Sequence, residues 1–474
     1  MTTIDIAFYS SCAVTFIIVD CPSDVVRYKP NGLIMNTVEG LQDMYMHPSK
    51  TQKARGYIGL RAGRPAFSII NALDREEHAP RRKMLSRAFS TVALRKYEPV
   101  IYKIAKEFGD NLLQSPEFGE KARSWGPAMD VGHMSSYFTF DIMSNTVFYS
   151  PQNTMTEPHA RPIIELIDKN MKMAGMEVVQ PRLVDYRKLR IRLVPKFSKK
   201  LDEFMERMQP LVMGRIELEK KQHVDDIFGD LIAQRGQEDS GLTDHDLMAD
   251  AIVMVIAGTD TSSVAISSFF FYLARHPEVY KRLADEIRST FSNLEEIAPG
   301  PKLTSCVYLL ACIDEAMRLA PPVAAPLWRT MRMQESIAGH VFAKGTDLAS
   351  CPYAIQRNPN YFPNPHEYIP ERWLPENQSE EALKLAKRAF IPFSLGSRGC
   401  LGKNIAYMEL TTSLAQIVFR ADWKCAEGPV GTVGETRIGT KGAVNFEIKA
   451  YFTSEKHGPF IQFAPRDLDR QISA

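Results

Sequence analysis

The stretch "FSLGSRGCLGKN", Phe393 to Asn404, places one cysteine between two glycines and two residues after an arginine. Gly396 permits a tight turn, and Gly402 removes side-chain bulk where a helix is expected to begin, near Lys403. The free N–H groups of that helix would face the Cys400 sulfur and lower the pKa of its thiol. A thiolate held in this way is either a nucleophile or a metal ligand. A nucleophile needs a nearby base, and no Cys–His signature accompanies Cys400.

The composition of the whole chain excludes several classes of protein. The 474 residues are 45% hydrophobic and 24% charged, which is typical of a globular protein with a large core. The net charge of +2 gives no global electrostatic reason to expect nucleic-acid binding. The seven cysteines form no CxxC pair, so a disulfide scaffold or a structural zinc site is not expected.

Two apolar runs raise the question of a membrane span. Residues 6–19 lie between acidic residues without a basic flank, and the run is short for a span, so a buried strand or a poor signal region fits it better. Residues 251–274 carry Asp260 and several hydroxyl groups within an apolar run. We interpret this second run as a core helix.

Turn and cap signals divide the chain into elements. Residues 24–36 predict a hairpin around a Pro-Asn-Gly turn, and apolar residues recur at helical spacing in 99–114, 131–149, 160–175 and 196–221. The longest helix begins after the N-cap Thr243 and has no proline before Pro277, which predicts about 33 residues and a length of about 50 Å. A helix near 305–319, short strands in 323–356, a proline-rich meander in 357–377 and C-terminal strands complete the pattern. The expected fold is mainly α with a small β part, as a single large domain around a long central helix.

The spacing in "FSLGSRGCLG" resembles the haem-binding signature of the cytochrome P-450 family. Phe393, Gly396, Arg398, Cys400 and Gly402 occupy its fixed positions. The resemblance implies the cytochrome P-450 fold and haem b as the cofactor, with Cys400 as the axial ligand of the haem iron. It also implies that Phe393 packs near the sulfur and that Arg398 pairs with a haem propionate.

The sequence "EAMR" places Glu315 and Arg318 three residues apart on the helix that ends before Pro321. Such a pair is commonly a surface ion pair of little energetic value. It also resembles the ExxR motif of the same family, with Arg372 in "PERW" as the third member. The resemblance implies a buried network of these three residues that holds the loop behind the haem.

The sequence "AGTDTS", Ala257 to Ser262, interrupts the long apolar helix with a glycine and hydroxyl groups. One interpretation is a helix kink with satisfied side chains. The resemblance instead implies an oxygen-activation groove in which Gly258 makes room for dioxygen. Thr261 and Asp260 would be the catalytic residues of a proton relay that begins at the solvent.

The sequence "EEHAPRRKMLSRAF", 76–89, is rich in basic residues and could be a solvated helix face. The resemblance implies that His78 and Arg82 reach the haem propionates, with Arg329 as a third contact. Pro80 is tolerable only if it lies in the first helical turn. The remaining basic residues, together with Lys403, would form the docking face for an acidic electron donor.

Positions that face the substrate are implied only by the family layout. They are the loop around 60–75, the segment 163–195, Ala257, Val323 to Pro326 including Ala324, and the turn at Phe452 and Thr453. Most of these positions are small and apolar, so a hydrophobic small-molecule substrate is expected.

The resemblance implies a monooxygenase that inserts one oxygen atom from O2 into a hydrophobic small molecule. The motif spacing is similar to that of filamentous-fungal members of the microsomal class, which act on secondary metabolites such as terpenoids, polyketides and alkaloids. Electrons would come from NADPH through a cytochrome P-450 reductase, with cytochrome b5 as a further candidate donor. Two alternatives remain: a haem-thiolate isomerase or dehydratase, and a non-catalytic haem-binding sensor.

The resemblance assigns residues 24–474 to the haem-thiolate catalytic domain. We expect residues 1–23 to be a short N-terminal segment in which the membrane anchor of microsomal members is absent or vestigial. The family expectation is the cytosolic face of the endoplasmic reticulum membrane, and a peripheral membrane contact is a further expectation. No partner of the nucleic-acid class is expected.

Overall fold

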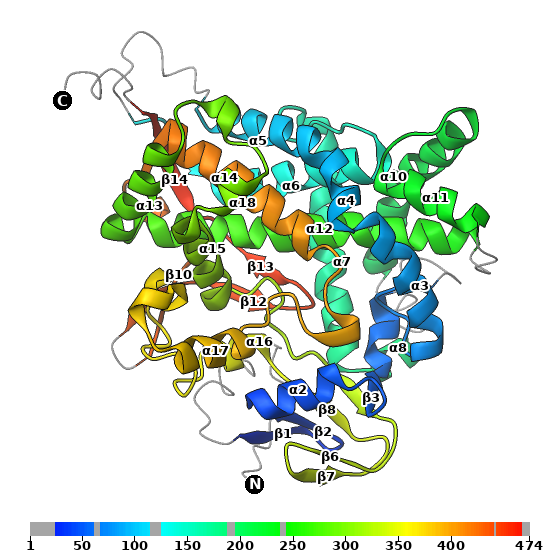
Figure 1. The fold of residues 1–474 in the computed structure, drawn as a ribbon. Coiled ribbons are helices and arrows are strands. Elements are labelled where there is room, and N and C mark those ends of the chain that lie inside the picture. The colour runs from blue at the N-terminus through cyan, green and yellow to red at the C-terminus, as the bar shows by residue number, and fades with distance from the viewer. Residues whose placement is uncertain are drawn as a thin grey trace.

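The computed structural model describes residues 24–60, 67–113, 125–186, 195–237, 243–439 and 442–466. The expectation for residues 1–23 lies outside the described residues. Helices fill the upper and right-hand parts of Figure 1, and short strands gather at the lower edge and on the left. The helical and β parts pack around one continuous hydrophobic core, which agrees with the predicted single domain.

Helix α12 (Asp244–Leu273) crosses the middle of the molecule (Figure 1). The Thr243 hydroxyl accepts a hydrogen bond from the Asp246 N–H, and the Asp246 carboxylate accepts one from the Thr243 N–H, which forms a complete capping box. Within the described residues, α12 is the one helix long and apolar enough to cross a membrane, but 78% of its apolar window is buried inside the protein. The prediction of a core helix is therefore confirmed.

Small and hydroxyl side chains determine how closely α6 packs against α12. A Cβ at Gly258 would lie 2.3 Å from the Met143 sulfur, so glycine allows α6 (Val131–Phe148) to approach closely. The Thr139 hydroxyl of α6 donates to the Thr259 carbonyl over 2.8 Å. Helices α5 (Glu98–Leu113) and α18 (Lys403–Arg420) pack on each other beside this pair.

The largest sheet combines strands from distant parts of the sequence. Its order is β1 (Val25–Lys29), β2 (Gly32–Met35), β8 (Asp347–Ala349), β5 (Arg329–Met331) and β3 (Thr51–Lys53). The antiparallel β1–β2 pair is the predicted hairpin. In the β3–β5 pair, Lys53 stands directly opposite Arg329.

The other elements surround this frame. The helices are α2 (Val38–Met46), α3 (Arg75–Ala88), α4 (Thr91–Leu94), α7 (Pro162–Val179), α8 (Arg182–Asp185), α10 (Pro195–Lys221), α11 (Ile227–Gln237), α13 (Pro277–Thr290), α14 (Pro301–Thr304), α15 (Val307–Leu319), α16 (Pro352–Ile355) and α17 (Glu380–Ala389). The strands are β4 (Met129–Asp130), β6 (Glu335–Ile337), β7 (His340–Phe342), β9 (Ala421–Cys425), β10 (Glu435–Ile438), β11 (Ala443–Phe446), β12 (Ile448–Ala450), β13 (Ser454–Lys456) and β14 (Phe460–Pro465).

Two local expectations need correction. Helix α12 has 30 residues rather than about 33, because Pro277 keeps His276 out of the helical conformation and the chain turns before it. Pro80 lies in the second turn of α3, not in the first. Asp74 occupies the N-cap, and Glu76 and Glu77 follow in the first turn, so this helix begins earlier than the proline alone suggests.

Candidate functional site

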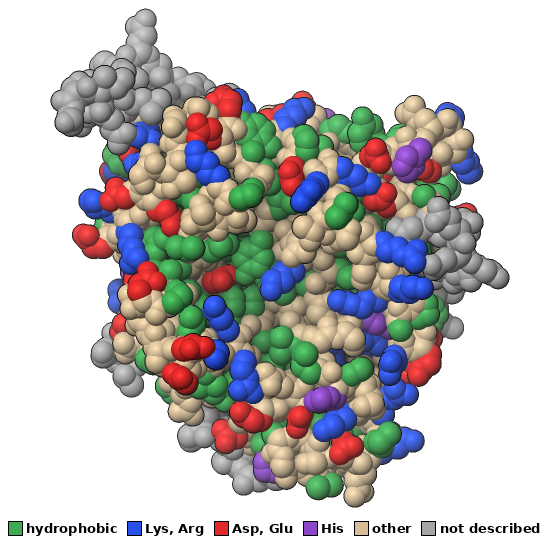
Figure 2. Space-filling view, viewed as in Figure 1, with side chains coloured by type: hydrophobic (Ala, Val, Ile, Leu, Met, Phe, Trp, Pro, Cys, Tyr) green, Lys and Arg blue, Asp and Glu red, His purple; other side chains and the backbone are tan. Residues whose placement is uncertain are grey.

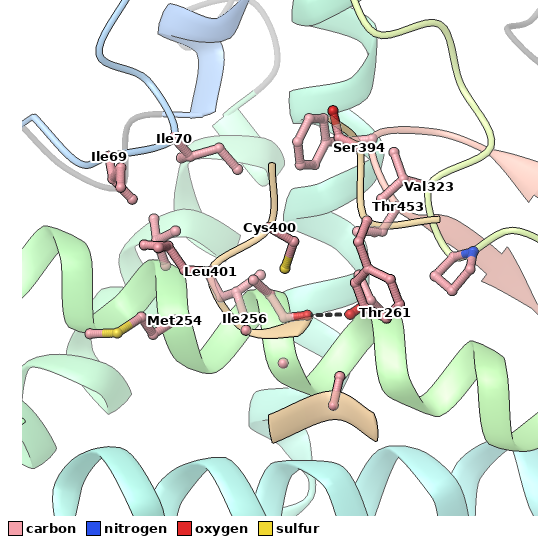
Figure 3. Close-up of a pocket in the computed structure, with 18 of the residues that line it drawn as sticks. Ile69, Ile70, Met254, Ile256, Thr261, Val323, Ser394, Cys400, Leu401 and Thr453 are labelled. Carbon is pink, nitrogen blue, oxygen red and sulfur yellow. Dashed lines mark hydrogen bonds between the residues drawn. The ribbon is translucent and has the colours of Figure 1, made fainter. Parts of the chain in front are cut away.

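A cavity of about 360 Å³ separates α12 from the loop that precedes α18. Cys400 and Leu401 line one wall, and Met254, Ile256 and Thr261 of α12 line another. Figure 3 shows the Cys400 sulfur pointing toward α12, near Thr261. The two most distinctive sequence motifs therefore meet at one cavity.

The Cys400 loop folds as its glycines predict. Gly396 has φ +65°, and a Cβ there would lie 2.2 Å from the Tyr45 carbonyl oxygen, so the turn needs glycine. The Cys400 N–H donates to the Phe393 carbonyl over 2.8 Å, which closes the loop. Gly402 caps α18, and a Cβ there would lie 3.8 Å from the Cys400 sulfur. The glycines thus leave the sulfur open to the cavity.

The expected low pKa of the Cys400 thiol is not found in the protein chain itself. Burial raises the pKa, while the N–H groups of Gly402 and Lys403 and the charge of Arg82 oppose that rise. The Cys400 side chain is exposed to the cavity, and the protein that surrounds the sulfur disfavours the charged thiolate. Phe393 forms the adjacent wall, and its ring lies 5.2 Å from that of Tyr407.

Five basic side chains converge on the same cavity: Lys53, His78, Arg82, Arg329 and Arg398. Within the described residues, none of them forms an ion pair with a carboxylate. Their recorded hydrogen bonds go to backbone carbonyls, from Arg398 to Ala72 and Leu73, from Arg82 to Gly399, from Arg329 to Trp328, and from Lys53 to Ile70. Burial and the four surrounding cations lower the pKa of His78 to about 2.

This basic cluster fits a ligand that carries its own negative charges. Lys53 and Arg329 are 9% and 4% exposed and lie opposite each other in adjacent strands, an arrangement that is unfavourable for like charges. Buried cations are retained in proteins when they are paired. The two propionates of a haem would provide that charge, and the cavity beside Cys400 provides an accessible thiol sulfur for its iron. The residues present therefore fit the cofactor that the sequence predicts.

Lys53 is a member of the cluster that no sequence motif indicates. It stands at the end of a three-residue strand with no hydrophobic alternation, so its local sequence carries no signal. Its position becomes informative only when β3 pairs with β5 and brings it opposite Arg329. His78, Arg82, Arg329 and Arg398, which the sequence analysis proposed, all line the cavity.

The predicted relay residues of α12 point in different directions. Thr261 and Ala257 border the cavity, and the Thr261 hydroxyl donates to the Ala257 carbonyl over 2.7 Å (dashed line in Figure 3). Asp260 is 7% exposed, and its carboxylate accepts a hydrogen bond from the Thr453 hydroxyl rather than from Thr261. Burial and Asp168 raise the pKa of Asp260 to about 6.

Glu315, Arg318 and Arg372 form one buried network. The Arg318 guanidinium donates two hydrogen bonds to the Glu315 carboxylate, over 2.9 and 2.8 Å, and Arg372 donates a third over 3.0 Å. Arg318 also donates to the carbonyls of Gln356, Pro365 and Glu367 in the meander. Burial alone would raise the pKa of Glu315, but the two arginines together lower it. The network holds the meander against α15, so these residues do not form a surface pair.

The expected substrate positions fall into two groups. Ala257, Val323, Phe452 and Thr453 line the cavity. Ala324 does not; it is 1% exposed, and its carbonyl accepts a hydrogen bond from the Cys351 thiol. Leu60, Ile69 and Ile70 of the 60–75 loop and Met171 of the segment 163–195 also line the cavity. Three apolar side chains that the sequence did not single out complete the wall: Phe89, Phe204 and Met254.

Part of the loop around 60–75 is fastened to α12 by charged groups. The Ile69 N–H donates to the Asp250 carboxylate over 2.6 Å, and the Phe67 N–H donates to Asp246 over 3.2 Å. Arg81 pairs with both carboxylates and is buried. Arg81 is therefore not part of an exposed docking face, contrary to the expectation for the basic residues of 76–89.

Comparison with known proteins agrees with this geometry. The sequence model of the family described as Cytochrome P450 matches residues 41–442. A cytochrome P450 monooxygenase of Gibberella fujikuroi, apf7, is 35% identical over 461 residues, which cover 93% of this chain and 86% of that protein. Those of Emericella nidulans, atnE, and Alternaria alternata, AKT7, are each 31% identical and cover 94% and 93% of this chain, and 85% of each relative. The predicted fold and family are confirmed: the chain belongs to the cytochrome P450 family of haem- and oxygen-dependent monooxygenases.

Proposed function

We propose that this protein is a haem-thiolate monooxygenase of fungal secondary metabolism, in which Cys400 is the axial ligand of the haem iron. The observation that carries the proposal is the cavity bounded by Cys400, by Thr261 and by five basic side chains that form no ion pair with a carboxylate in the described parts of the chain. Bound haem would supply the redox chemistry that activates dioxygen and transfers one oxygen atom to the substrate.

The side chains of the site have distinct proposed tasks. Lys53, His78, Arg82, Arg329 and Arg398 bind the propionates, and hydrogen bonds to backbone carbonyls orient Lys53 and the three arginines before the cofactor arrives. Phe393 and the glycines shape the space around the sulfur. The Glu315, Arg318 and Arg372 network holds the meander, and Ala257, Val323 and Phe452 exclude water from an apolar substrate.

The electron supply is proposed to be NADPH through a cytochrome P450 reductase, with cytochrome b5 as a second donor. Figure 2 shows Lys and Arg side chains gathered on the face that presents α3 and the start of α18. Lys83 and Arg87 of α3 and Lys403 of α18 are exposed. A positive face beside the Cys400 loop suits an acidic donor, because complementary charge steers association.

The ligand assignment is tested by the carbon monoxide difference spectrum of the reduced protein. The wild type should show the red-shifted Soret band of a thiolate-ligated haem, and Cys400→Ala should lose it. Cys425→Ala, which changes a half-buried cysteine outside the cavity, should keep the band. A wild type without the band would contradict the ligand assignment.

The reaction class and the substrate need separate measurements. A monooxygenase consumes O2 in step with NADPH when a reductase is present, whereas an isomerase or dehydratase forms product without either. Co-expression with a fungal reductase and product profiling against terpenoids, polyketides and alkaloids would identify the substrate class. Fractionation of the expressing cells would test the proposed association with the endoplasmic reticulum membrane.

A further inference from the structure

The carboxyl group of Asp260 connects to the cavity through a side chain outside α12. Asp260 is absent from the cavity wall, but its hydrogen-bond partner Thr453 lines that wall. Thr453 lies on the segment between strands β12 and β13, and Figure 3 labels it among the side chains that line the cavity with Thr261 and Cys400. Thr453 is itself buried, so its hydroxyl lies between a buried acid and the cavity.

The geometry of α12 explains why Thr261, which follows Asp260 in sequence, does not hydrogen-bond to the Asp260 carboxyl group. Consecutive residues on an α-helix point about 100° apart, so Asp260 and Thr261 do not face each other. The Thr261 hydroxyl donates to the carbonyl of its own preceding turn. Within the described residues, the recorded side-chain partner of Asp260 is Thr453, not Thr261.

On the side away from the cavity, Asp260 faces a chain of charged groups that reaches the surface. Lys456 of β13 donates to Ser263 of α12 over 2.7 Å and to Ser136 of α6 over 3.2 Å. Asp168 of α7 is exposed and interacts electrostatically with both Lys456 and Asp260. Glu455, next to Lys456, pairs with Lys172 of α7. Asp260 therefore lies between charged groups that reach the solvent and the Thr453 hydroxyl at the cavity wall.

These surroundings keep Asp260 able to exchange a proton near neutral pH. Burial, Asp168 and Glu455 raise its pKa, while Lys456 and the Thr453 hydroxyl lower it, and the result is about 6. A group whose pKa lies near the working pH is a better proton donor and acceptor than one fixed in either state.

We infer that Thr453 is the hydroxyl that passes protons from Asp260 into the cavity, and that Lys456 is a positioning residue for this relay. The inference rests on the proposed monooxygenase function. When Asp260 is protonated, its O–H donates to the Thr453 oxygen, and the Thr453 O–H is free to donate to a water in the cavity. Transfer along both bonds moves one proton from Asp260 to that water. The carboxylate then regains a proton from solvent on the Asp168 side.

The test uses the reconstituted holoenzyme with a cytochrome P450 reductase and no added substrate. The rate of NADPH oxidation is measured in H2O and in D2O for the wild type, Thr453→Val, Thr453→Ser and Thr261→Val. Thr453→Val keeps the shape but removes the hydroxyl, so its rate should fall roughly tenfold or more and its solvent isotope effect should rise. Thr453→Ser keeps the hydroxyl, so its rate of NADPH oxidation and its solvent isotope effect should match those of the wild type.

A second readout does not depend on turnover. The infrared carboxyl band that disappears in Asp260→Asn is titrated with pH in each variant. Thr453→Val should raise the midpoint, because the Thr453 hydrogen bond lowers the Asp260 pKa. Lys456→Met should raise it as well, because a positive charge near the carboxylate is lost. Thr453→Ser should leave the midpoint unchanged.

The outcomes separate the relay from the enzyme class. If the wild type shows the carbon monoxide band and oxidises NADPH, and Thr453→Val matches it in rate and isotope effect, the relay is overturned and the proposed function stands. If Thr261→Val alone changes the isotope effect, the protons bypass Thr453, and the inference is again wrong. If the wild type lacks the carbon monoxide band, the proposed function fails before the relay is reached.

Discussion

Lys53 and Arg329 are a buried pair of basic side chains for which the described residues provide no carboxylate partner. The pKa of Lys53 is well below its usual value because of burial and of the charges of Arg329, Arg398 and Arg82. Removal of the charge should remove this repulsion in the apoprotein and also remove one contact to a bound propionate. Removal of the Lys53 charge should therefore stabilise the apoprotein but weaken the binding of haem.

We predict that Lys53→Met loses haem to an excess of apomyoglobin roughly tenfold faster than the wild type, since a hydrogen bond to a charged group contributes about 1.5–3 kcal/mol. The apoprotein of the variant should unfold at a higher temperature than the wild-type apoprotein. Lys50→Met, which changes a lysine bonded to the Ser336 carbonyl outside the cavity, serves as the control. Equal haem loss in Lys53→Met and wild type would contradict the assignment.

Glu409 links stability to pH. It is buried, its carboxylate accepts a hydrogen bond from the Ser262 hydroxyl, and burial raises its pKa from 4.5 to about 8. The folded state holds the proton on Glu409 more tightly than the unfolded chain does, so protonation of Glu409 stabilises the fold. This contribution to stability is complete below pH 4.5 and is lost as the pH rises through about 8.

Glu409→Gln is neutral at every pH and should flatten the pH dependence of the holoenzyme's thermal midpoint across that window. Glu278→Gln changes an exposed carboxylate on α13 and should keep the wild-type dependence. A Glu409→Gln variant that loses as much stability as the wild type between these pH values would show that another group is responsible.

Residue-level reading of the sequence found the motif residues but not their partners. Cys400, Arg398 and the Glu315 network occupy short fixed patterns, and in the structure each lies at a cavity wall or in a buried network. The partner of Asp260 comes from a turn 193 residues away in sequence, and Lys53 is paired through a sheet. Such contacts depend on tertiary packing, which no local pattern encodes.

At the scale of elements, the meander is held by one carboxylate. Glu315 accepts hydrogen bonds from Arg318, Arg372, the Trp373 indole and the Ile369 N–H. Removal of the charge leaves two buried guanidinium groups without their partner, which is more costly than the loss of the bonds themselves.

We predict that Glu315→Gln lowers the free energy of unfolding by about 3–5 kcal/mol, measured by denaturant unfolding of the holoenzyme. Glu380→Gln removes an exposed ion pair with Lys384, four residues later on α17, and should change the free energy of unfolding by less than about 1 kcal/mol. If the two variants lose similar stability, the buried network does not hold the meander in the way described.

The elements themselves were predictable where caps and periodicity agree. Thr243 and Asp246 marked the start of α12, and apolar spacing marked α5, α6 and α10. The sheet order was not predictable, because β3, β5 and β8 have three residues each, and the β3–β5 and β2–β8 pairs join segments that lie hundreds of residues apart. Strands this short carry no alternation pattern that would set their register.

At the scale of the whole molecule, the charged surface beside the Cys400 loop should control electron transfer. Lys403 is exposed at the start of α18, close to the loop that holds Cys400. Lys281 is exposed on α13, which packs against the opposite end of α18 through Arg288 and the Val418 carbonyl. The two lysines therefore form a matched pair for charge reversal.

Lys403→Glu should raise the reductase concentration needed for half-maximal NADPH oxidation and weaken its dependence on ionic strength, while Lys281→Glu should leave both unchanged. Titration of the reductase at low and high salt measures both quantities. An identical response of the two variants would place the docking surface elsewhere.

The cluster of five basic side chains also has a consequence for how the protein accumulates in a cell. A ligand that binds only the folded state lowers the fraction of unfolded chains by mass action. Since the apoprotein must bury Lys53 and Arg329 against each other, newly synthesised chains should depend on haem supply to escape proteolysis. The abundance of this enzyme in a fungal or bacterial host should therefore follow porphyrin biosynthesis as closely as it follows transcription.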